Sequence, residues 1–376
     1  MIPEPAFTLG IEEEYLLVDR ASRDLVLDPP AALLAECEKQ LGNRVSPEFL
    51  RSQIEVQTGV CASAAVARAE LAELRRTVAE VATKFGMAPI AAATHPLASH
   101  ITQQRTDKER YHALHEDLQG VARRLVICGM HVHVGIEDDE LKIDLMNQVS
   151  YFLPHLLALS TSSPFWQGED TGLKSYRIAV FDEMPRTGIP ERFESWGEYN
   201  RHTSTLVKLG IIDETSKLWW DIRPSSRFPT LEMRIADVCT ILDDGIAIAC
   251  LYRCLLRMLW RLRIANQRWR LYLRMLIDEN RWRAQRYGTD EGLVDFGRAE
   301  LVPYPQLLDE MLALVHEDAQ HFGCTAELAH ARTILKRGTS AHNQLRVYQA
   351  ALAEGRDHGE ALNAVVDWLI DASGNQ

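Results

Sequence analysis

The sequence predicts an α+β protein in which a largely antiparallel sheet carries helices on its back and a helical C-terminal region follows. Three observations support this fold class. Segments of alternating polarity are confined to about the first 240 residues, and the chain beyond them has the apolar period of helices. The order of elements is not a regular alternation of strand and helix, and glycine-rich dinucleotide-binding and Walker A sequences are absent.

Four strand segments carry charged or imidazole side chains at every second position: residues 10–18, 51–57, 129–135 and 231–235. Side chains two residues apart lie on the same face of a strand, so the polar residues face one way and the apolar residues between them face a core. If the strands share a sheet, one face packs against helices and the other presents polar groups. That polar set is Glu12, Glu14, Gln53, Glu55, Gln57, His131, His133, Glu232 and Arg234.

The remaining elements follow from local pattern. Alternation and β-branched content predict strands over residues 6–18, 25–28, 49–59, 88–94, 126–136, 218–223 and 230–238. Apolar residues at helical spacing predict helices over residues 30–41, 63–85, 107–123, 138–160, 242–287, 305–318, 324–336, 339–354 and 358–372. Residues 161–212 have no clear period but carry aromatic and basic residues, which predicts a long functional loop.

At 376 residues the chain could hold two domains, but large single domains of this length exist. We predict a single catalytic domain over residues 1–376, with a sheet-bearing core (1–240) and a helical region packed on it (241–376). The net charge of −12 argues against general nucleic-acid affinity. The N-terminus lacks the basic start of a signal peptide, and no apolar run is long enough to cross a membrane. Seven cysteines without a Cys-x-x-Cys pair indicate a reduced, cytoplasmic protein.

The polar sheet face predicts a metal site. So many like charges on one surface repel each other unless a cation lies among them. Carboxylate-rich sites with an imidazole favour Mg²⁺ or Mn²⁺ over zinc, and Glu48, close to Glu55, adds a further oxygen ligand. For Glu12–Glu14 alone, a solvated acidic run is the competing interpretation. For His131 and His133, a pair of structural histidines or a hydrolase-type zinc site competes.

Several arginines accompany the acidic residues. Carboxylates with nearby arginines suggest a polyphosphate held through bridging metals. Arg223 and Arg234 lie on strands that also carry ligand candidates, and we assign them, with His133, to catalysis. The loop arginines Arg177, Arg186 and Arg227 are candidates for binding ATP or substrate.

Two other functions compete with this interpretation. One is a metal-dependent hydrolase built on His131 and His133. The other is a nucleic-acid- or partner-binding protein using residues 253–286, which hold ten arginines together with Trp260, Trp269 and Trp282. Because the chain is acidic overall, a solvated helix face paired with the acidic body, or a contact between subunits, accounts for this segment better.

In this order the motifs resemble the carboxylate–amine ligase branch of the type-2 glutamate–cysteine ligases, which have a glutamine-synthetase-like catalytic fold. The resemblance spans about residues 7–240 and the whole chain by length. No single motif is specific to the family, whereas the four in order, with the loop at 185–196, are. The matching segments are Leu9–Asp19, Gln53–Gly59, Gly129–Gly135, Leu231–Asp237, Pro185–Pro190 and Ser195–Trp196.

The resemblance implies a concave sheet forming a double funnel, with ATP entering from one end and the carboxylate and amine substrates from the other. Glu14, Glu48 and Glu55 would hold one metal. Glu12, His131 and Glu232 would hold a second that bridges the phosphates, and His133 and Arg234 would touch phosphate or substrate carboxylate.

The predicted activity is that of an ATP-dependent carboxylate–amine ligase acting through an acyl phosphate, with glutamate–cysteine ligase activity that yields ADP, phosphate and γ-glutamylcysteine. Phosphorylation turns a poor electrophile into one with a good leaving group, so no side-chain nucleophile is required. The expected partners are ATP and small amino-acid substrates. The expected assembly is a homodimer rather than a glutamine-synthetase-type ring, because the first metal strand begins near the start of this sequence.

Overall fold

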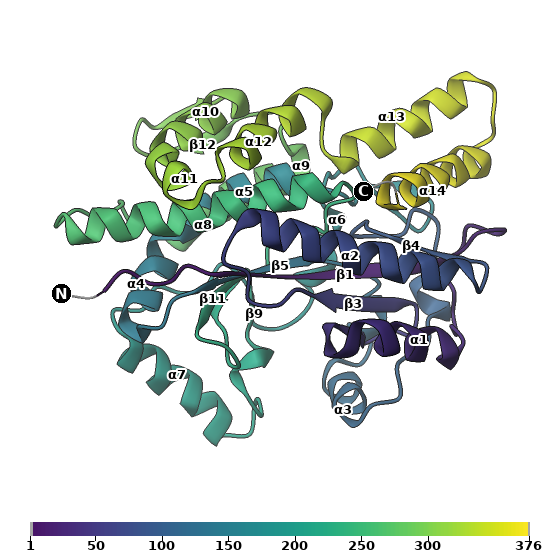
Figure 1. Cartoon of the computed structure of the whole chain (residues 1–376), viewed down its shortest axis with the longest axis horizontal. Coiled ribbons are helices and arrows are strands. Elements are labelled where there is room, and N and C mark those ends of the chain that lie inside the picture. The colour runs from purple at the N-terminus through teal and green to yellow at the C-terminus, as the bar shows by residue number, and fades with distance from the viewer. Residues whose placement is uncertain (1–2, 375–376) are drawn as a thin grey trace.

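The computed structural model describes residues 3–374 (Figure 1). Within them, seven strands form the main sheet, and all of its strand pairs are antiparallel. These strands are β1 (Leu9–Asp19), β2 (Val45–Pro47), β3 (Gln53–Gln57), β4 (Met87–Ile90), β5 (Met130–Gly135), β10 (Ile222–Pro224) and β11 (Thr230–Met233). Their order is β10-β11-β5-β1-β3-β2, and β4 pairs with the last residues of β1.

Short two-stranded ribbons and many helices surround this sheet. The ribbons are β6 (Phe165–Trp166) with β7 (Glu169–Asp170), β8 (Thr187–Gly188) with β9 (Trp219–Trp220), and β12 (Leu293–Asp295) with β13 (Glu300–Val302). The helices are α1 (Ala31–Leu41), α2 (Ala64–Thr83), α3 (Glu109–Leu118), α4 (Asp139–Val149), α5 (Leu153–Ser160), α6 (Tyr176–Phe181), α7 (Trp196–Lys208), α8 (Leu242–Ile264), α9 (Arg274–Tyr287), α10 (Tyr304–Leu314), α11 (His316–Phe322), α12 (Thr325–Arg337), α13 (Ser340–Ala353) and α14 (His358–Gly374).

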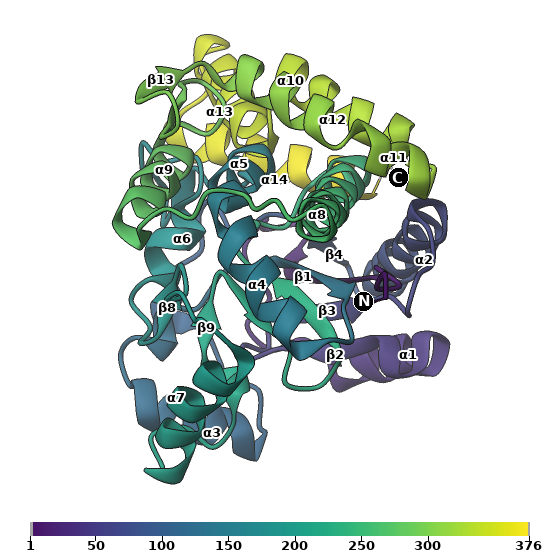
Figure 2. The ribbon, with the colours of Figure 1, turned by 90° about the vertical axis from the view of Figure 1, so that its left-hand side faces the viewer.

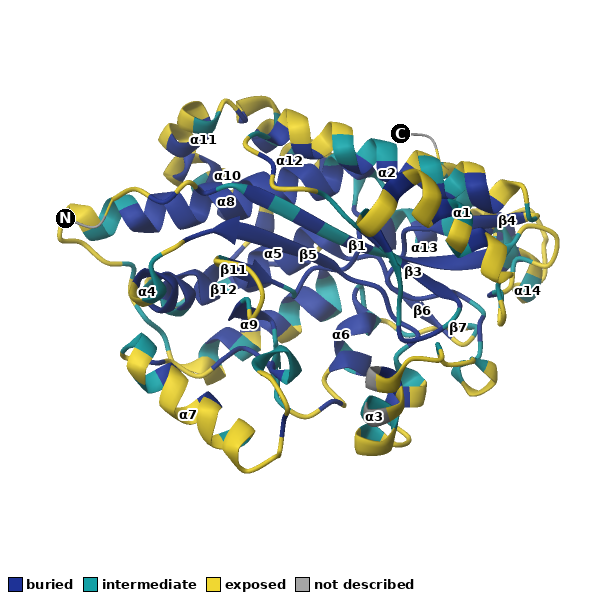
Figure 3. Ribbon diagram, turned by 60° about the horizontal axis from the view of Figure 1, so that its bottom comes forward, coloured by how far each residue is buried: buried dark blue, intermediate teal, exposed yellow. Residues whose placement is uncertain are grey.

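The sheet separates two unequal sides of the molecule. Helices α2 and α8 run along one side and contact β1, with α10, α11 and α12 lying beyond α8 and α14 packed on α2 and β4. Helices α3 and α7 lie on the other side, as Figures 1 and 2 show together. In Figure 3 the strands and α8 are buried, whereas α7 is largely exposed. The helix-covered side therefore holds the core, and the other face of the sheet is left for α3, α7 and the segments around them.

Strand β1 shows the predicted alternation: Glu12 and Glu14 face one way, and Glu13 between them points into the core. Glu13 is fully buried, and Arg75 of α2 donates two hydrogen bonds to it, at 2.8 and 2.7 Å. Tyr15, two residues on and on the same face, donates a third at 2.5 Å. Arg75 also donates to the carbonyls of Cys239 and Thr240, so one guanidinium ties β1, α2 and the segment before α8 together.

The prediction of one helix over residues 242–287 was wrong. Helix α8 ends at Ile264 and α9 begins at Arg274, and the chain between them is hydrogen-bonded to side chains of α4. Asn266 adopts a positive φ of 56°, and the amide of Trp269 donates to the side chain of Gln148 at 2.8 Å. Tertiary contacts therefore override the helical period. The helices predicted over 138–160 and 305–318 are likewise each divided in two, and the strand at 25–28 is reduced to one bridge, Val18–Leu25.

Residues 161–212 are not one irregular loop, because α6 and α7 lie within them. The start of α7 had a readable signal. The side chain of Ser195 accepts a hydrogen bond from the amide of Glu198 at 3.1 Å, the first half of the Ser-x-x-Glu capping pattern. Among residues 3–374 there is no helix that is both long enough and apolar enough to cross a lipid bilayer.

Candidate active site

Strand register brings the predicted polar residues together on one face of the sheet. On neighbouring strands Glu12 lies opposite His131, Glu14 opposite Glu55, and Glu232 opposite His133. Arg223 on the edge strand β10 lies opposite Glu232. Residues from five segments of the sequence thus form one cluster.

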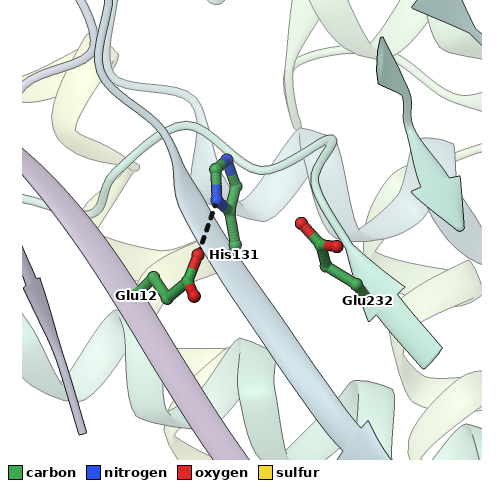
Figure 4. Close-up of side chains that lie close together, drawn as sticks. All are labelled: Glu12, His131 and Glu232. Atoms are coloured by element: carbon green, nitrogen blue, oxygen red, sulfur yellow. Dashed lines mark hydrogen bonds and ion pairs between the residues drawn. The ribbon is translucent and has the colours of Figure 1, made fainter. Parts of the chain in front are cut away.

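Glu12, His131 and Glu232 form the first donor group, in which one ligand atom of each lies within 4.8 Å of the others. Figure 4 shows Glu12 and His131 extending from adjacent strands beside the carboxylate of Glu232. Because a carboxylate only accepts, the Nδ1–H of His131 donates to Glu12 Oε2, at 3.2 Å. Burial opposes ionisation of Glu12, but this hydrogen bond and the nearby His133 outweigh it and hold the pKa of Glu12 well below its usual range. Burial and the charge of Arg234 lower the pKa of His131 to about 4, so its ring is neutral at pH 7.

Glu232 is neutralised by two arginines. Arg223 Nε donates to Glu232 Oε2 at 2.9 Å, and Arg234 donates to Oε1 of the same carboxylate. Burial alone would raise the pKa of Glu232, but the charges of Arg234 and Arg223 hold it well below its usual range. The first donor group is therefore ionised and has its counter-charges in place.

Glu14, Glu48 and Glu55 form the second donor group, again with ligand atoms within 4.8 Å of one another. Glu14 accepts a hydrogen bond from the amide of Gly129 at 2.7 Å, and the hydroxyl of Ser46 donates to Glu55 at 3.2 Å. Burial, followed by the charge of Glu48, raises the pKa of Glu14 to about 7. The same two causes raise the pKa of Glu55 well above its usual range. The carboxylates of this second group therefore repel one another, which those of the first group, with their counter-charges, do not.

The chemistry of the donors fits a hard divalent cation. Five carboxylates and one imidazole make up the two groups, which is an oxygen-dominated set of the kind that Mg²⁺ and Mn²⁺ prefer. A buried nitrogen beside them, Arg234 Nε, has no hydrogen-bond partner within residues 3–374, and His133 Nε2 lies 3.5 Å from Glu12 Oε1. Buried polar atoms usually find a partner, and Arg234 lines the same cavity as the donors.

Both donor groups line a cavity of about 590 Å³, and four of the predicted arginines line it with them: Arg177, Arg223, Arg227 and Arg234. The guanidinium of Arg177 also binds the protein's own backbone. It donates to the carbonyls of Ile235 and Arg234, at 3.2 and 3.1 Å. Arg186 is not in the lining. Its guanidinium donates to the carbonyl of Lys217 at 3.1 Å and lies over the ring of Trp219.

Several lining residues escaped the sequence analysis, among them Lys108, Tyr111, Lys217, Trp219 and Phe228. They come from α3 and from the connections around β9 to β11, where no alternation marks a face. Phe228 adjoined the predicted Arg227, and its ring lies edge-on to His133 with centroids 5.9 Å apart. For Phe228, its position next to the predicted Arg227 was the only sign in the sequence of a place in the site.

The basic segment 253–286 is largely occupied by contacts within the chain. Arg257 and Arg261 both bind Asp318, and Arg281 binds Asp182 and Asp221. Trp260, also from this segment, is buried. These arginines attach the C-terminal helices to the rest of the molecule, which removes much of the basis for a nucleic-acid-binding function.

The model of the glutamate-cysteine ligase family 2 matches residues 8–367. A Rhodospirillum rubrum protein with the provisional name glutamate–cysteine ligase 2 is 66% identical over 371 residues, which cover 98% of this chain and 95% of that protein. A protein of the same provisional name from Jannaschia sp. is 54% identical over 365 residues, covering 97% and 96%.

Solved structures with a similar fold are ligases. The glutamate–cysteine ligase of Francisella tularensis, solved in complex with AMP, has a TM-score of 0.70 at 13% identity, covering 98% of this chain and 89% of that one. A bifunctional glutathione synthetase of Pasteurella multocida has a TM-score of 0.69 at 14% identity. It matches 97% of this chain, which spans 52% of that longer protein. The predicted α+β, glutamine-synthetase-like fold class is confirmed.

Proposed function

The chain belongs to the glutamate-cysteine ligase family 2, and on this premise we propose that it is an ATP-dependent ligase joining the γ-carboxylate of glutamate to the amine of cysteine through an acyl phosphate. The products are ADP, phosphate and γ-glutamylcysteine. The observation that carries the proposal is the pairing of two donor groups, one charge-balanced and one self-repelling, on one sheet face inside one cavity. AMP in the related Francisella structure supports a nucleotide as one occupant.

In this proposal the first donor group holds one Mg²⁺ or Mn²⁺ and the second holds another. Bound there, the ions supply charge neutralisation for the phosphates of ATP and for the phosphoryl group in transfer. The balance of protein charge suits this division. The second group needs a cation to relieve its own repulsion, whereas the first already has Arg223 and Arg234 beside it.

The side chains around the first group bind and orient the phosphates. Arg234 is held against Glu232, and its unpartnered Nε is free to donate to a phosphate oxygen. His133 is fixed by a contact of 2.9 Å between its Nδ1 and the hydroxyl of Thr230, and its Nε2 lies 3.5 Å from Glu12 Oε1 beside the first donor group. Arg227, an exposed residue on the turn between β10 and β11, closes the phosphate side of the cavity.

The reaction itself needs two steps and no covalent enzyme intermediate. A carboxylate oxygen of glutamate attacks the terminal phosphorus of ATP, and ADP leaves. The amine then attacks the carbonyl carbon, phosphate leaves, and the amine loses a proton. The cavity contributes by holding the reactants in line and away from bulk water.

The test is turnover by the pure protein. With ATP, Mg²⁺, glutamate and cysteine, ADP and γ-glutamylcysteine should appear in equal amounts, measured by chromatography and mass spectrometry. EDTA should abolish both products while the far-ultraviolet circular dichroism spectrum is unchanged. The proposal fails if ADP forms without any amide product for every pair of amino acids tried, or if ATP binds with full affinity in EDTA.

A further inference from the structure

The cavity has two chemically different ends. The end beside the first donor group is mainly polar, with Arg223, Arg227 and Ser225 in its lining beside the ring of Phe228. The end beside the second donor group has a largely apolar wall, which we call the apolar end. Its residues come from four segments of the chain and are Phe49, Tyr111, Leu114, Ile127, Phe181 and Met184.

Direct contacts connect the apolar end to the second donor group. The amide of Phe49 donates to its neighbour Glu48 at 3.0 Å, and the ring of Phe49 lies edge-on to Tyr111 at 5.7 Å. Phe181 lies 5.3 Å below the guanidinium of Arg177, whose charge acts on Glu14. A substrate that reaches the second donor group from this side therefore passes along an apolar wall.

Lys108, whose ammonium lies 5.8 Å from the ring centroid of Tyr111, also lines the cavity, but two other polar groups at this end are committed within the protein. The hydroxyl of Tyr111 donates to the carbonyl of Pro47 at 3.1 Å, and the side-chain amide of Gln53 donates to the carbonyl of Ile127 at 2.7 Å. A polar substrate side chain would lose its hydrogen bonds to water here without gaining these groups as partners. An apolar side chain would lose no hydrogen bonds and would be favoured by the removal of its surface from water.

We propose that the apolar end receives the side chain of the amine substrate, and that it accepts amino acids with apolar side chains larger than that of cysteine beside cysteine itself. Cysteine belongs to the same class, because a thiol behaves as a small apolar group. This inference rests on the proposed ligase function for the identification of the ligand as an amine.

Leucine and asparagine provide the test, because their side chains have nearly the same size and shape but opposite polarity. With glutamate, ATP and Mg²⁺, kcat/KM for leucine should exceed that for asparagine by about tenfold or more. Equal values, or a higher value for asparagine, would overturn the inference.

A pair of variants on α3 locates the effect. Leu114 lines the cavity, whereas Leu118, one turn further along the same helix, is packed against the core outside the lining. Leu114→Asn should lower the leucine-to-asparagine ratio of kcat/KM several-fold while the KM for ATP is unchanged. Leu118→Asn should leave the ratio as it is in the natural protein. If both variants change the ratio equally, the apolar end is not the selective element.

A binding measurement separates this inference from the proposed function. Calorimetric titration of the protein with leucine or asparagine, in the presence of Mg²⁺ and ADP, requires no turnover. If no amide forms from any pair, the ligase proposal fails, but tighter binding of leucine that is lost in Leu114→Asn still supports the apolar end. Binding of both amino acids alike, or of neither, contradicts it.

Discussion

Glu12 and His131 are directly opposite each other on β1 and β5, and their side chains are joined by a contact of 3.2 Å between Oε2 and Nδ1. Two residues along β1, Glu14 faces a different partner, Glu55 of β3. This register divides one acidic face into two sites with opposite electrostatic character. In the first, imidazoles and arginines stabilise the carboxylates, and in the second the carboxylates destabilise one another.

Neutralising one carboxylate in each group should therefore change stability in opposite directions. In metal-free protein, Glu55→Gln relieves repulsion and should raise the free energy of unfolding by about 1 kcal/mol. Glu232→Gln leaves Arg223 and Arg234 buried without their counter-charge and should lower it by about 3 kcal/mol. Urea denaturation in EDTA measures both. Changes of the same sign in the two variants would refute this assignment of charges.

Glu14 should make the metal-free protein less stable as the pH rises. The pKa of Glu14 is about 7 in the folded chain, against an ordinary value of 4.5. Between these values the folded chain holds a proton that the unfolded chain has released, so the contribution of Glu14 to the free energy of unfolding decreases as the pH rises through this window. Buried histidines such as His131, whose pKa is about 4, act in the opposite direction, so the effect is measured against Glu14→Gln. In EDTA, the Tm of the natural protein relative to that of Glu14→Gln should be lower at about pH 8 than at about pH 6, and Mg²⁺ should stabilise the natural protein more at the higher pH. A difference in Tm that is equal at the two pH values, or that rises, would contradict the assignment.

Removing Arg75 should unfold or strongly destabilise the protein. Arg75→Met leaves Glu13 buried without its cation, a change that costs about 3–5 kcal/mol. The double variant Arg75→Met, Glu13→Gln should recover part of this loss because no unpaired charge is left. Thermal unfolding followed by circular dichroism measures the two, and a single variant as stable as the natural protein would show that the pair has no structural role.

The two loop arginines should behave differently. Arg227 lines the cavity, whereas Arg186 donates to a backbone carbonyl and lies over Trp219 outside the lining. Arg227→Met should raise the KM for ATP about tenfold, the effect of losing one charge-assisted hydrogen bond. Arg186→Met serves as the matched control, with a KM for ATP close to that of the natural protein. If the two variants have equal effects in steady-state kinetics, binding by Arg227 is not supported.

The strands were predictable because alternation is a property of the strand itself. A two-residue period fixes the face of Glu12, Glu14, His131 and Glu232, and the order of the motifs identified the family. The charge balance was only partly predictable. The two-residue spacing places Arg234 beside Glu232, but only the register adds Arg223. Among residues 3–374 no arginine forms an ion pair with Glu55, so the repulsion expected of the whole face is confined to the second donor group.

Elements whose shape depends on contacts with residues far away in the sequence could not be predicted either. The helical period continues past Ile264, and the break becomes understandable only once Trp269 is seen bound to Gln148 of α4. The role of Arg177 is another example. It was predicted as a loop arginine that binds a ligand; it lines the cavity and also donates to the backbone carbonyls after β11. Long-range partners of this kind leave no local pattern.

In the proposed reaction a substrate carboxylate is phosphorylated before the amine attacks. Transfer of an oxygen isotope from that carboxylate to phosphate tests this order of steps most directly. Glutamate labelled with heavy oxygen in its γ-carboxylate is incubated with the protein, ATP, Mg²⁺ and the amine, and the released inorganic phosphate is analysed by mass spectrometry. The acyl-phosphate route predicts one heavy oxygen atom in each phosphate released during amide formation. Phosphate that carries no label while the amide forms, or release of AMP and pyrophosphate in its place, would contradict it.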